Sequence, residues 1–120
     1  MTTTKKIKIT TEEFTKALED AVTLMGEGFV YVSYPYDMCQ YEIDGEPSCL
    51  LGHALWNLGI PMPEVNINIF DLFTLYYDAP SSLSLAAREA QRDQDRGETW
   101  GAALSSFKYI LAHPDDAYGS

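Results

Sequence analysis

The sequence predicts an α+β fold: a helix-dominated single domain of about five helices with a small antiparallel β-hairpin or three-stranded sheet. Apolar residues recur at helical spacing in several segments, and one segment is rich in the aromatic and β-branched residues that strands favour. A length of 120 residues with 46% hydrophobic residues suits one globular core. We expect the domain to cover residues 1–120, with residues 1–4 and 115–120 frayed.

The N-terminal elements follow from alternation and from capping signals. Residues 5–9 read Lys-Lys-Ile-Lys-Ile, which predicts a short edge strand protected by its lysines. Thr10 then fits an N-cap, with Glu13 three residues later to complete a capping box, and Gly26 ends the apolar period. The first helix should therefore start after Thr10 and end near Gly26.

The middle of the chain predicts two strands and a second helix. Residues 29–34 should form a strand, and residues 39–43 should return as its antiparallel partner. The second helix should start near Pro47 and end at Gly59. Gly52 lies inside this helix, where glycine costs about 1 kcal/mol relative to alanine. Another backbone or a ligand should therefore approach closely at Gly52.

Three further helices are expected in the second half. Residues 66–78 combine a strand-like alternation with a helix-start signal at Asn68, and we expect a helix over residues 69–77. Because this segment is apolar on most sides, it is either central to the core or part of an association surface. The fourth helix should span residues 82–96, and the fifth should end at the His113-Pro114 pair.

The charge distribution bears on the class of partner. The net charge is −10, and residues 17–87 contain ten acidic residues and no lysine or arginine. Such a field repels nucleic acid and anionic membranes and attracts basic partners, although solubility alone is the alternative explanation. The sequence has neither an apolar run of about 18 residues nor the apolar region of a signal peptide. We therefore expect a cytoplasmic protein with no membrane association.

Cys49 and His53 form the first candidate site. Cys39 and Cys49 are expected to be thiols, because disulfides are rare in the cytoplasm. Cys49 should lie in the first turn of the second helix, where the helix dipole lowers a thiol pKa. This placement superficially resembles that in papain-like cell-wall peptidases. However, an i,i+4 histidine lies alongside the cysteine instead of pointing at it, so we expect no catalytic residues.

The same residues offer a metal site as an alternative. Cys49 and His53 could supply two ligands, Cys39 a third, and His113 or a carboxylate the fourth. The paired, closely spaced cysteines typical of structural zinc sites are missing, so we expect no metal and no cofactor. Burial of Cys49 as a small apolar residue is the remaining alternative. If these side chains border a pocket, the candidate pocket residues are Cys49, His53, Trp56, Gln94, Asp95 and Trp100.

Tyrosines concentrated in the predicted hairpin form the second candidate site. Alternate strand residues point to opposite faces, so some of these tyrosines should lie outside the core. Exposed tyrosine in acidic surroundings favours a protein interface, with ordinary strand packing as the alternative. The candidate partner-binding residues are Tyr31, Tyr34, Tyr36, Asp37, Tyr41, Glu42, Asp44 and Glu46.

Two stretches together resemble a known group of proteins. Residues 39–55 read Cys-Gln-Tyr-Glu-Ile-Asp-Gly-Glu-Pro-Ser-Cys-Leu-Leu-Gly-His-Ala-Leu, and residues 90–103 read Ala-Gln-Arg-Asp-Gln-Asp-Arg-Gly-Glu-Thr-Trp-Gly-Ala-Ala. The order of a Gly-x-Pro-x-Cys-Leu-x-Gly motif and a Gln-x-x-Gln-Asp-x-Gly-x-x-Trp motif resembles small proteins of unassigned function from actinobacterial phages. The resemblance implies a phage-encoded protein acting in the host bacterial cytoplasm and assigns no catalytic residue.

The sequence therefore favours a non-catalytic acidic binding protein, a phage accessory factor that engages a host or phage protein. One alternative is a thiol- or metal-dependent enzyme centred on Cys49 and His53. The other is a structural component that forms a homo-oligomer through residues 66–78.

Overall fold

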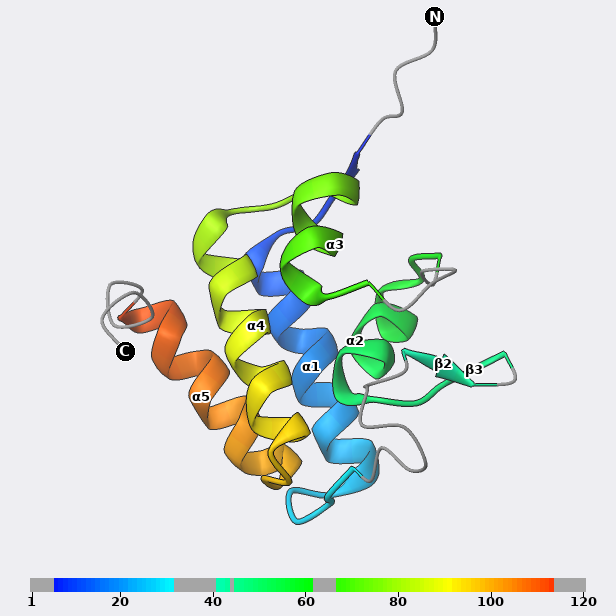
Figure 1. Ribbon diagram of the computed structural model, residues 1–120, viewed down its shortest axis with the longest axis vertical. Helices are drawn as coiled ribbons and strands as arrows, with labels where there is room; N and C mark the ends of the chain where they lie inside the picture. Colours follow the sequence, from blue (N-terminus) through cyan, green and yellow to red (C-terminus); the bar gives the residue numbers. More distant parts are fainter. Residues whose placement is uncertain (1–5, 32–40, 44, 62–66, 114–120) are drawn as a thin grey trace, which may run out of the picture.

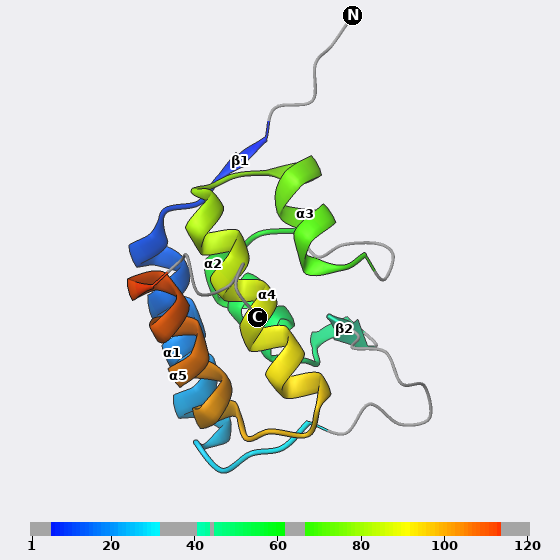
Figure 2. The ribbon, with the colours of Figure 1, turned by 60° about the vertical axis from the view of Figure 1, so that its left-hand side comes forward.

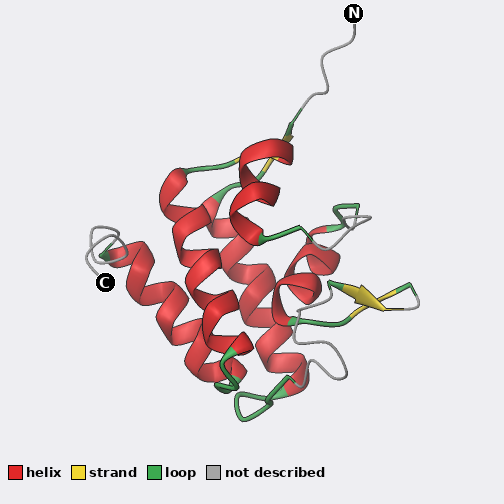
Figure 3. Cartoon of the chain, viewed as in Figure 1, coloured by secondary structure: helices red, strands yellow, loops and turns green. Residues whose placement is uncertain are grey.

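The computed structural model describes residues 6–31, 41–43, 45–61 and 67–113, and within them five helices account for most of the chain (Figures 1 and 3). The helix-dominated class expected from the sequence is confirmed. The expected frayed ends, residues 1–4 and 115–120, lie outside the described residues.

Helix α1, Thr11–Met25, begins and ends where its sequence signals predict. The Glu13 backbone N–H donates to the Thr10 side-chain oxygen at 3.1 Å, which satisfies one of the free amides at the helix start. Gly26 closes the helix with φ +97°, a backbone conformation that favours glycine. The buried face of α1 includes Phe14, Leu18 and Val22.

The small sheets differ from the expected antiparallel sheet. Strand β1, Ile7–Lys8, pairs in parallel with β4, Tyr77–Asp78, so the antiparallel expectation is wrong there. The Ile9 backbone N–H also donates to the Asp78 carbonyl oxygen at 3.0 Å. Strands β2, Glu42–Ile43, and β3, Glu46–Pro47, form a separate antiparallel pair of two residues each.

The expected pairing of residues 29–34 with residues 39–43 is not observed in the described parts of these segments. Val30 instead forms an isolated bridge with Thr99, while residues 42–43 pair with residues 46–47. The physical reason is the start of the last helix, whose first amides lack partners within the helix. The Trp100 and Gly101 backbone N–H groups donate to carbonyl oxygens of residues 29 and 27, both at 2.8 Å, and hold this segment against the helix.

Helices α2, Leu50–Leu58, and α3, Ile69–Tyr76, confirm two predicted segments. Gly59 ends α2 with φ +73°, and Asn68 caps α3 by accepting a hydrogen bond from the Asp71 backbone N–H at 2.9 Å. The helix-start signal at Asn68 thus prevails over the strand-like alternation, because the asparagine side chain satisfies a free amide of the first turn.

Helices α4, Ser81–Asp95, and α5, Trp100–Ala112, complete the fold. Figures 1 and 2 show α1, α4 and α5 side by side, with α3 lying across the N-terminal end of α4. Helix α2 packs against α1. Phe14 joins the layers: its ring stacks with Phe107 of α5 at 5.8 Å between centroids and meets Phe73 of α3 edge-on at 5.6 Å.

Candidate functional site

Cys49 is the N-cap of α2 rather than a residue of its first turn. Its sulfur accepts a hydrogen bond from the Gly52 backbone N–H at 3.4 Å, and the residue has 0% exposure to solvent. A thiolate nucleophile has to reach its substrate, whereas this sulfur faces the helix amides inside the core. The observed geometry suits capping and packing.

Gln94 connects the two sequence motifs. Its side-chain oxygen accepts a hydrogen bond from the Leu50 backbone N–H at 2.7 Å, so α4 caps the start of α2. Gln94 is 1% exposed, and a buried amide without a partner is costly, which explains why a polar residue stands here. The motif around residue 49 and the motif around residue 94 therefore pack against each other, and we call this contact between the start of α2 and the end of α4 the joint.

Gly52 explains the close packing of this joint. An added Cβ at Gly52 would lie 2.1 Å from the Tyr41 carbonyl oxygen, far inside van der Waals contact. The predicted close approach at Gly52 is confirmed, and the group that approaches is a backbone. The same carbonyl oxygen accepts a hydrogen bond from the Ser48 backbone N–H at 2.9 Å.

His53 of α2 contacts Trp100 at the start of α5. Their rings contact edge-on with centroids 5.4 Å apart, and Trp100 also meets Phe29 at 4.6 Å. Trp100 is fully buried, and burial lowers the pKa of His53 below its ordinary value. His113, the second histidine, caps α5 and stacks on Tyr109 at 4.4 Å. In Figure 1 the C-terminal end of α5 lies away from α2.

The remaining two pocket candidates are exposed. The side chain of Trp56 lies on the outer face of α2 and is about half exposed. Asp95 ends α4 and accepts a hydrogen bond from the Gln94 side-chain N–H at 3.0 Å. Partial burial of its surroundings raises the pKa of Asp95, and this hydrogen bond opposes the rise. The six candidates therefore divide between core and surface instead of lining one pocket.

Two of the candidate partner-binding tyrosines, Tyr31 and Tyr41, lie among the described residues, and neither is fully exposed to solvent. Tyr41 is 4% exposed and donates its hydroxyl hydrogen bond to the Ile67 carbonyl oxygen at 2.6 Å. Tyr31 is half-buried, and its hydroxyl lies 3.0 Å from the Ser48 hydroxyl. Glu46 is exposed. The other interface candidates, Tyr34, Tyr36, Asp37, Asp44 and the side chain of Glu42, lie outside the described residues, as does Cys39.

The described residues hold no cluster of three or more histidine, cysteine, aspartate or glutamate side chains suited to a metal ion. In the same part of the chain, none of the helices combines the length and the hydrophobicity that crossing a bilayer requires.

A cavity of about 380 Å³ lies between α3, β4 and the first turns of α4. This volume falls in the ordinary range for ligand pockets. Its apolar wall is formed by Phe70, Phe73, Ala79 and Leu85, and its charged groups are Lys6 and Asp78. Its hydroxyl groups come from Thr74, Tyr77, Ser81 and Ser84.

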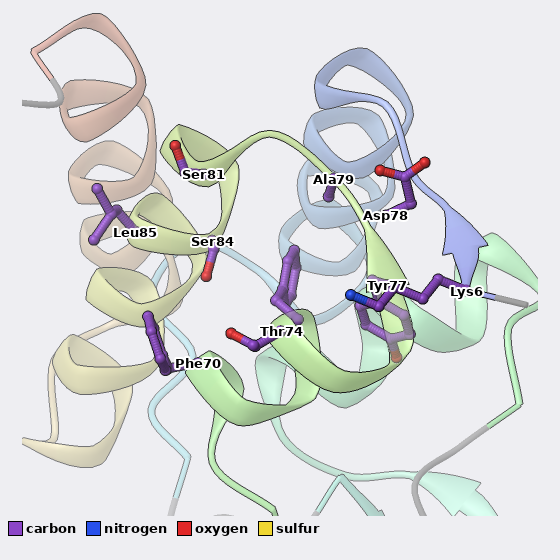
Figure 4. Close-up of a pocket in the computed structure, with 10 residues that line it drawn as sticks. Lys6, Phe70, Thr74, Tyr77, Asp78, Ala79, Ser81, Ser84 and Leu85 are labelled. Atoms are coloured by element: carbon purple, nitrogen blue, oxygen red, sulfur yellow. The ribbon is translucent and has the colours of Figure 1, made fainter. Parts of the chain in front are cut away.

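Two of these hydroxyls are buried without a hydrogen-bond partner among the residues that the structure describes: Tyr77 Oη and Ser84 Oγ. Burial raises the pKa of Tyr77 well above its ordinary value. Figure 4 shows the oxygens of Ser84 and Thr74 facing the gap between α4 and α3. A buried hydroxyl without a partner is unfavourable and calls for an explanation, and a bound molecule that forms the missing hydrogen bond is one such explanation.

The outer side of α3 adjoins this cavity. Phe70, Leu75 and Tyr76 are 50%, 60% and 51% exposed, respectively. Phe70, Asp71, Thr74 and Leu75 are spaced so that they share one side of the helix, which we call the α3 face. Phe70 belongs both to this face and to the cavity wall.

Sequence reasoning missed the cavity because the cavity depends on the parallel pairing of β1 with β4. The sequence did indicate an exposed surface nearby, because the segment 66–78 contains more apolar residues than one side of a helix can bury.

No family model, curated protein or solved structure matches the chain.

Proposed function

We propose that this protein is a non-catalytic binding domain that engages a basic protein segment through the α3 face and the adjoining cavity. The observation that carries the proposal is the exposure of two large apolar side chains, Phe70 and Leu75, on the α3 face of a helix of only eight residues. Exposed apolar patches next to a pocket are typical of protein interaction sites.

The size of α3 indicates that the interface extends beyond it. Eight residues of helix span about 12 Å, which is too little for the roughly 800 Å² that each partner buries in a standard interface. The cavity lies directly beside the α3 face and supplies additional surface. Phe70, shared by both, is the expected centre of the contact.

Charge favours a basic partner over a second copy of the chain. Each copy carries a net charge of −10, so two copies repel each other before contact, while a basic segment is attracted. Asp71 on the α3 face and Asp78 at the cavity offer local acidic groups, and among the described residues Lys6 is the one basic residue that lines the cavity. The resemblance to phage proteins makes a host or phage protein the proposed source of the segment.

The alternative of a thiol enzyme receives less support. Cys49 is buried and bonded to a helix amide, and His53 packs against Trp100. A nucleophile and its base need a reachable space between them for the reacting atom. The cavity that offers such a space is lined by neither residue.

Site-specific photocrosslinking in a lysate of host cells tests the proposed surface. A photoreactive p-benzoylphenylalanine replaces Leu75 on the α3 face, and a second variant carries it in place of Leu24, which is 71% exposed near the end of α1. We expect a crosslinked product at position 75, identified by mass spectrometry as a basic protein, that weakens in high salt and upon the Phe70→Asp substitution. Position 24 should give no such product.

Two results would contradict this proposal. A product with twice the mass of the chain, and no other, would support self-association through residues 66–78 instead. Equal products at positions 75 and 24 would show that the capture does not depend on the α3 face. Circular dichroism of each variant establishes that the fold is retained.

A further inference from the structure

The hydroxyl groups in the cavity point to a particular kind of occupant. We propose that the cavity binds an aromatic ring carrying a hydrogen-bonding group, a tyrosine or tryptophan side chain of the bound partner. This inference rests on the proposed binding role and names the chemistry of its central contact.

The composition of the wall selects a ring. Phe70, Phe73, Ala79 and Leu85 present carbon to the interior, and aromatic rings bury the largest apolar area per side chain. Rings also pack edge-on against other rings, and the wall already contains such a pair, Phe73 and Tyr77, with centroids 5.1 Å apart. A long flexible aliphatic chain would lose more conformational freedom on entering.

The unpaired hydroxyls select a polar group on that ring. Ser84 Oγ is buried and has no partner among the described residues, and Thr74 faces the same gap from α3 (Figure 4). A phenol or an indole N–H gives Ser84 Oγ a hydrogen bond, whereas phenylalanine would leave this oxygen unpaired. The polar group therefore determines specificity more than the ring itself.

Phe70 forms the entrance. Half of its surface is exposed, so few contacts hold its ring. When the ring moves aside, the hydroxyl of the partner's aromatic side chain can reach Ser84. The adjacent Asp71 lies on the same exposed side of α3, where it favours lysine or arginine next to the inserted ring. A segment with an aromatic residue flanked by basic residues fits both features.

The test uses p-cresol and toluene, which differ by the one hydroxyl group of interest. Each is titrated into the full chain while the backbone amide signals are followed by NMR. We expect p-cresol to shift signals of α3 and the first turns of α4, and to bind about five-fold more tightly than toluene, the effect of one neutral hydrogen bond. In Ser84→Ala the ratio should fall to about one, while Ser105→Ala, whose hydroxyl bonds the Gly101 carbonyl oxygen on α5, should keep it.

The outcomes separate this inference from the proposed function. If neither compound shifts the cavity signals, or if the ratio survives in Ser84→Ala, the inference is wrong, yet crosslinking at Leu75 can still succeed. A further arm uses the peptides Lys-Lys-Tyr-Lys-Lys and Lys-Lys-Phe-Lys-Lys. If the tyrosine peptide displaces p-cresol and the phenylalanine peptide does not, the occupant is a side chain of a protein partner. If p-cresol binds and neither peptide displaces it, the cavity is a site for a small molecule, and the proposal of a partner side chain is wrong.

Discussion

Replacing Gly52 by alanine tests the packing of the joint between α2 and the segment before it. In an ordinary helix interior, Gly→Ala stabilises a protein by about 0.5–1 kcal/mol. Here the new Cβ would lie 2.1 Å from the carbonyl oxygen and 2.8 Å from the carbonyl carbon of Tyr41. Because both atoms belong to the backbone, no side-chain rotation can relieve the overlap.

The expected magnitude follows from these opposing effects. Overpacking a core costs typically about 1–3 kcal/mol, and the severity of this overlap places Gly52→Ala at the upper end. Tyr41 is also held by the Ser48 N–H at its carbonyl and by Ile67 at its hydroxyl, so its displacement strains two further bonds. After the helix-propensity gain is subtracted, the free energy of unfolding should fall by about 2 kcal/mol, which lowers Tm by roughly 8 °C for a domain of this size.

Urea and thermal unfolding of the variant, followed by circular dichroism, measure this change. Gly28→Ala is the matched control, because an added Cβ there meets nothing within 4 Å and its backbone is not in the left-handed region. That control should change the stability by less than about 1 kcal/mol. If Gly52→Ala were as stable as wild type, the close approach of Tyr41 to α2 would be refuted.

Three further predictions concern single buried groups. Gln94→Leu leaves the Leu50 amide unpaired and should lower the unfolding free energy in urea by about 1–3 kcal/mol, whereas Gln91→Leu, which replaces a side-chain oxygen without a described partner, should cost less. Cys49→Ser keeps an N-cap acceptor and should remain more stable than Cys49→Val in thermal melts; equal losses would contradict the capping role. Because burial raises the pKa of Tyr77, the unfolded chain releases this proton first, so stability should fall as the pH rises above about 10. Tyr77→Phe should lessen that fall in urea titrations between about pH 9 and 11, and an unchanged slope would assign it to other tyrosines.

The helices could be predicted because their signals are local. Thr10, Asn68 and Thr99 each accept a hydrogen bond from the amide three residues later, and this geometry can be inferred from a few neighbouring residues. Gly26 and Gly59 end their helices with positive φ for an equally local reason. Even the close contact at Gly52 could be anticipated, because glycine inside a helix is costly without a packing reason.

The strands and the site could not be predicted, because they depend on distant pairings. Strand β1 has two residues and finds its parallel partner seventy positions later at Tyr77 and Asp78, a separation on which local alternation carries no information. Val30 is a β-branched residue of the kind that strands favour. Its segment nevertheless lies against the start of α5, because the backbone N–H groups of Trp100 and Gly101 donate to carbonyl oxygens of that segment. The sequence likewise suggests Tyr31 and Tyr41 as interface residues. In the fold, however, their hydroxyls form hydrogen bonds with Ser48 and Ile67, respectively.

Chemistry that stands out in a sequence can be fully used by the fold. From the sequence alone, the sulfur of Cys49 and the amide of Gln94 suggest a reactive or ligand-binding role. In the fold, however, the sulfur accepts a hydrogen bond from the Gly52 N–H, and the amide oxygen accepts one from the Leu50 N–H. A group that is already satisfied gains nothing from a ligand, because binding would first break the existing bond. We therefore expect binding where buried polar groups lack a partner and also border a cavity. Of the five such side-chain atoms in the described part of the chain, two, Ser84 Oγ and Tyr77 Oη, line the cavity beside α3. The proposed contact with a partner therefore rests on Ser84, on Tyr77 and on the exposed side of α3, and not on the buried Cys49.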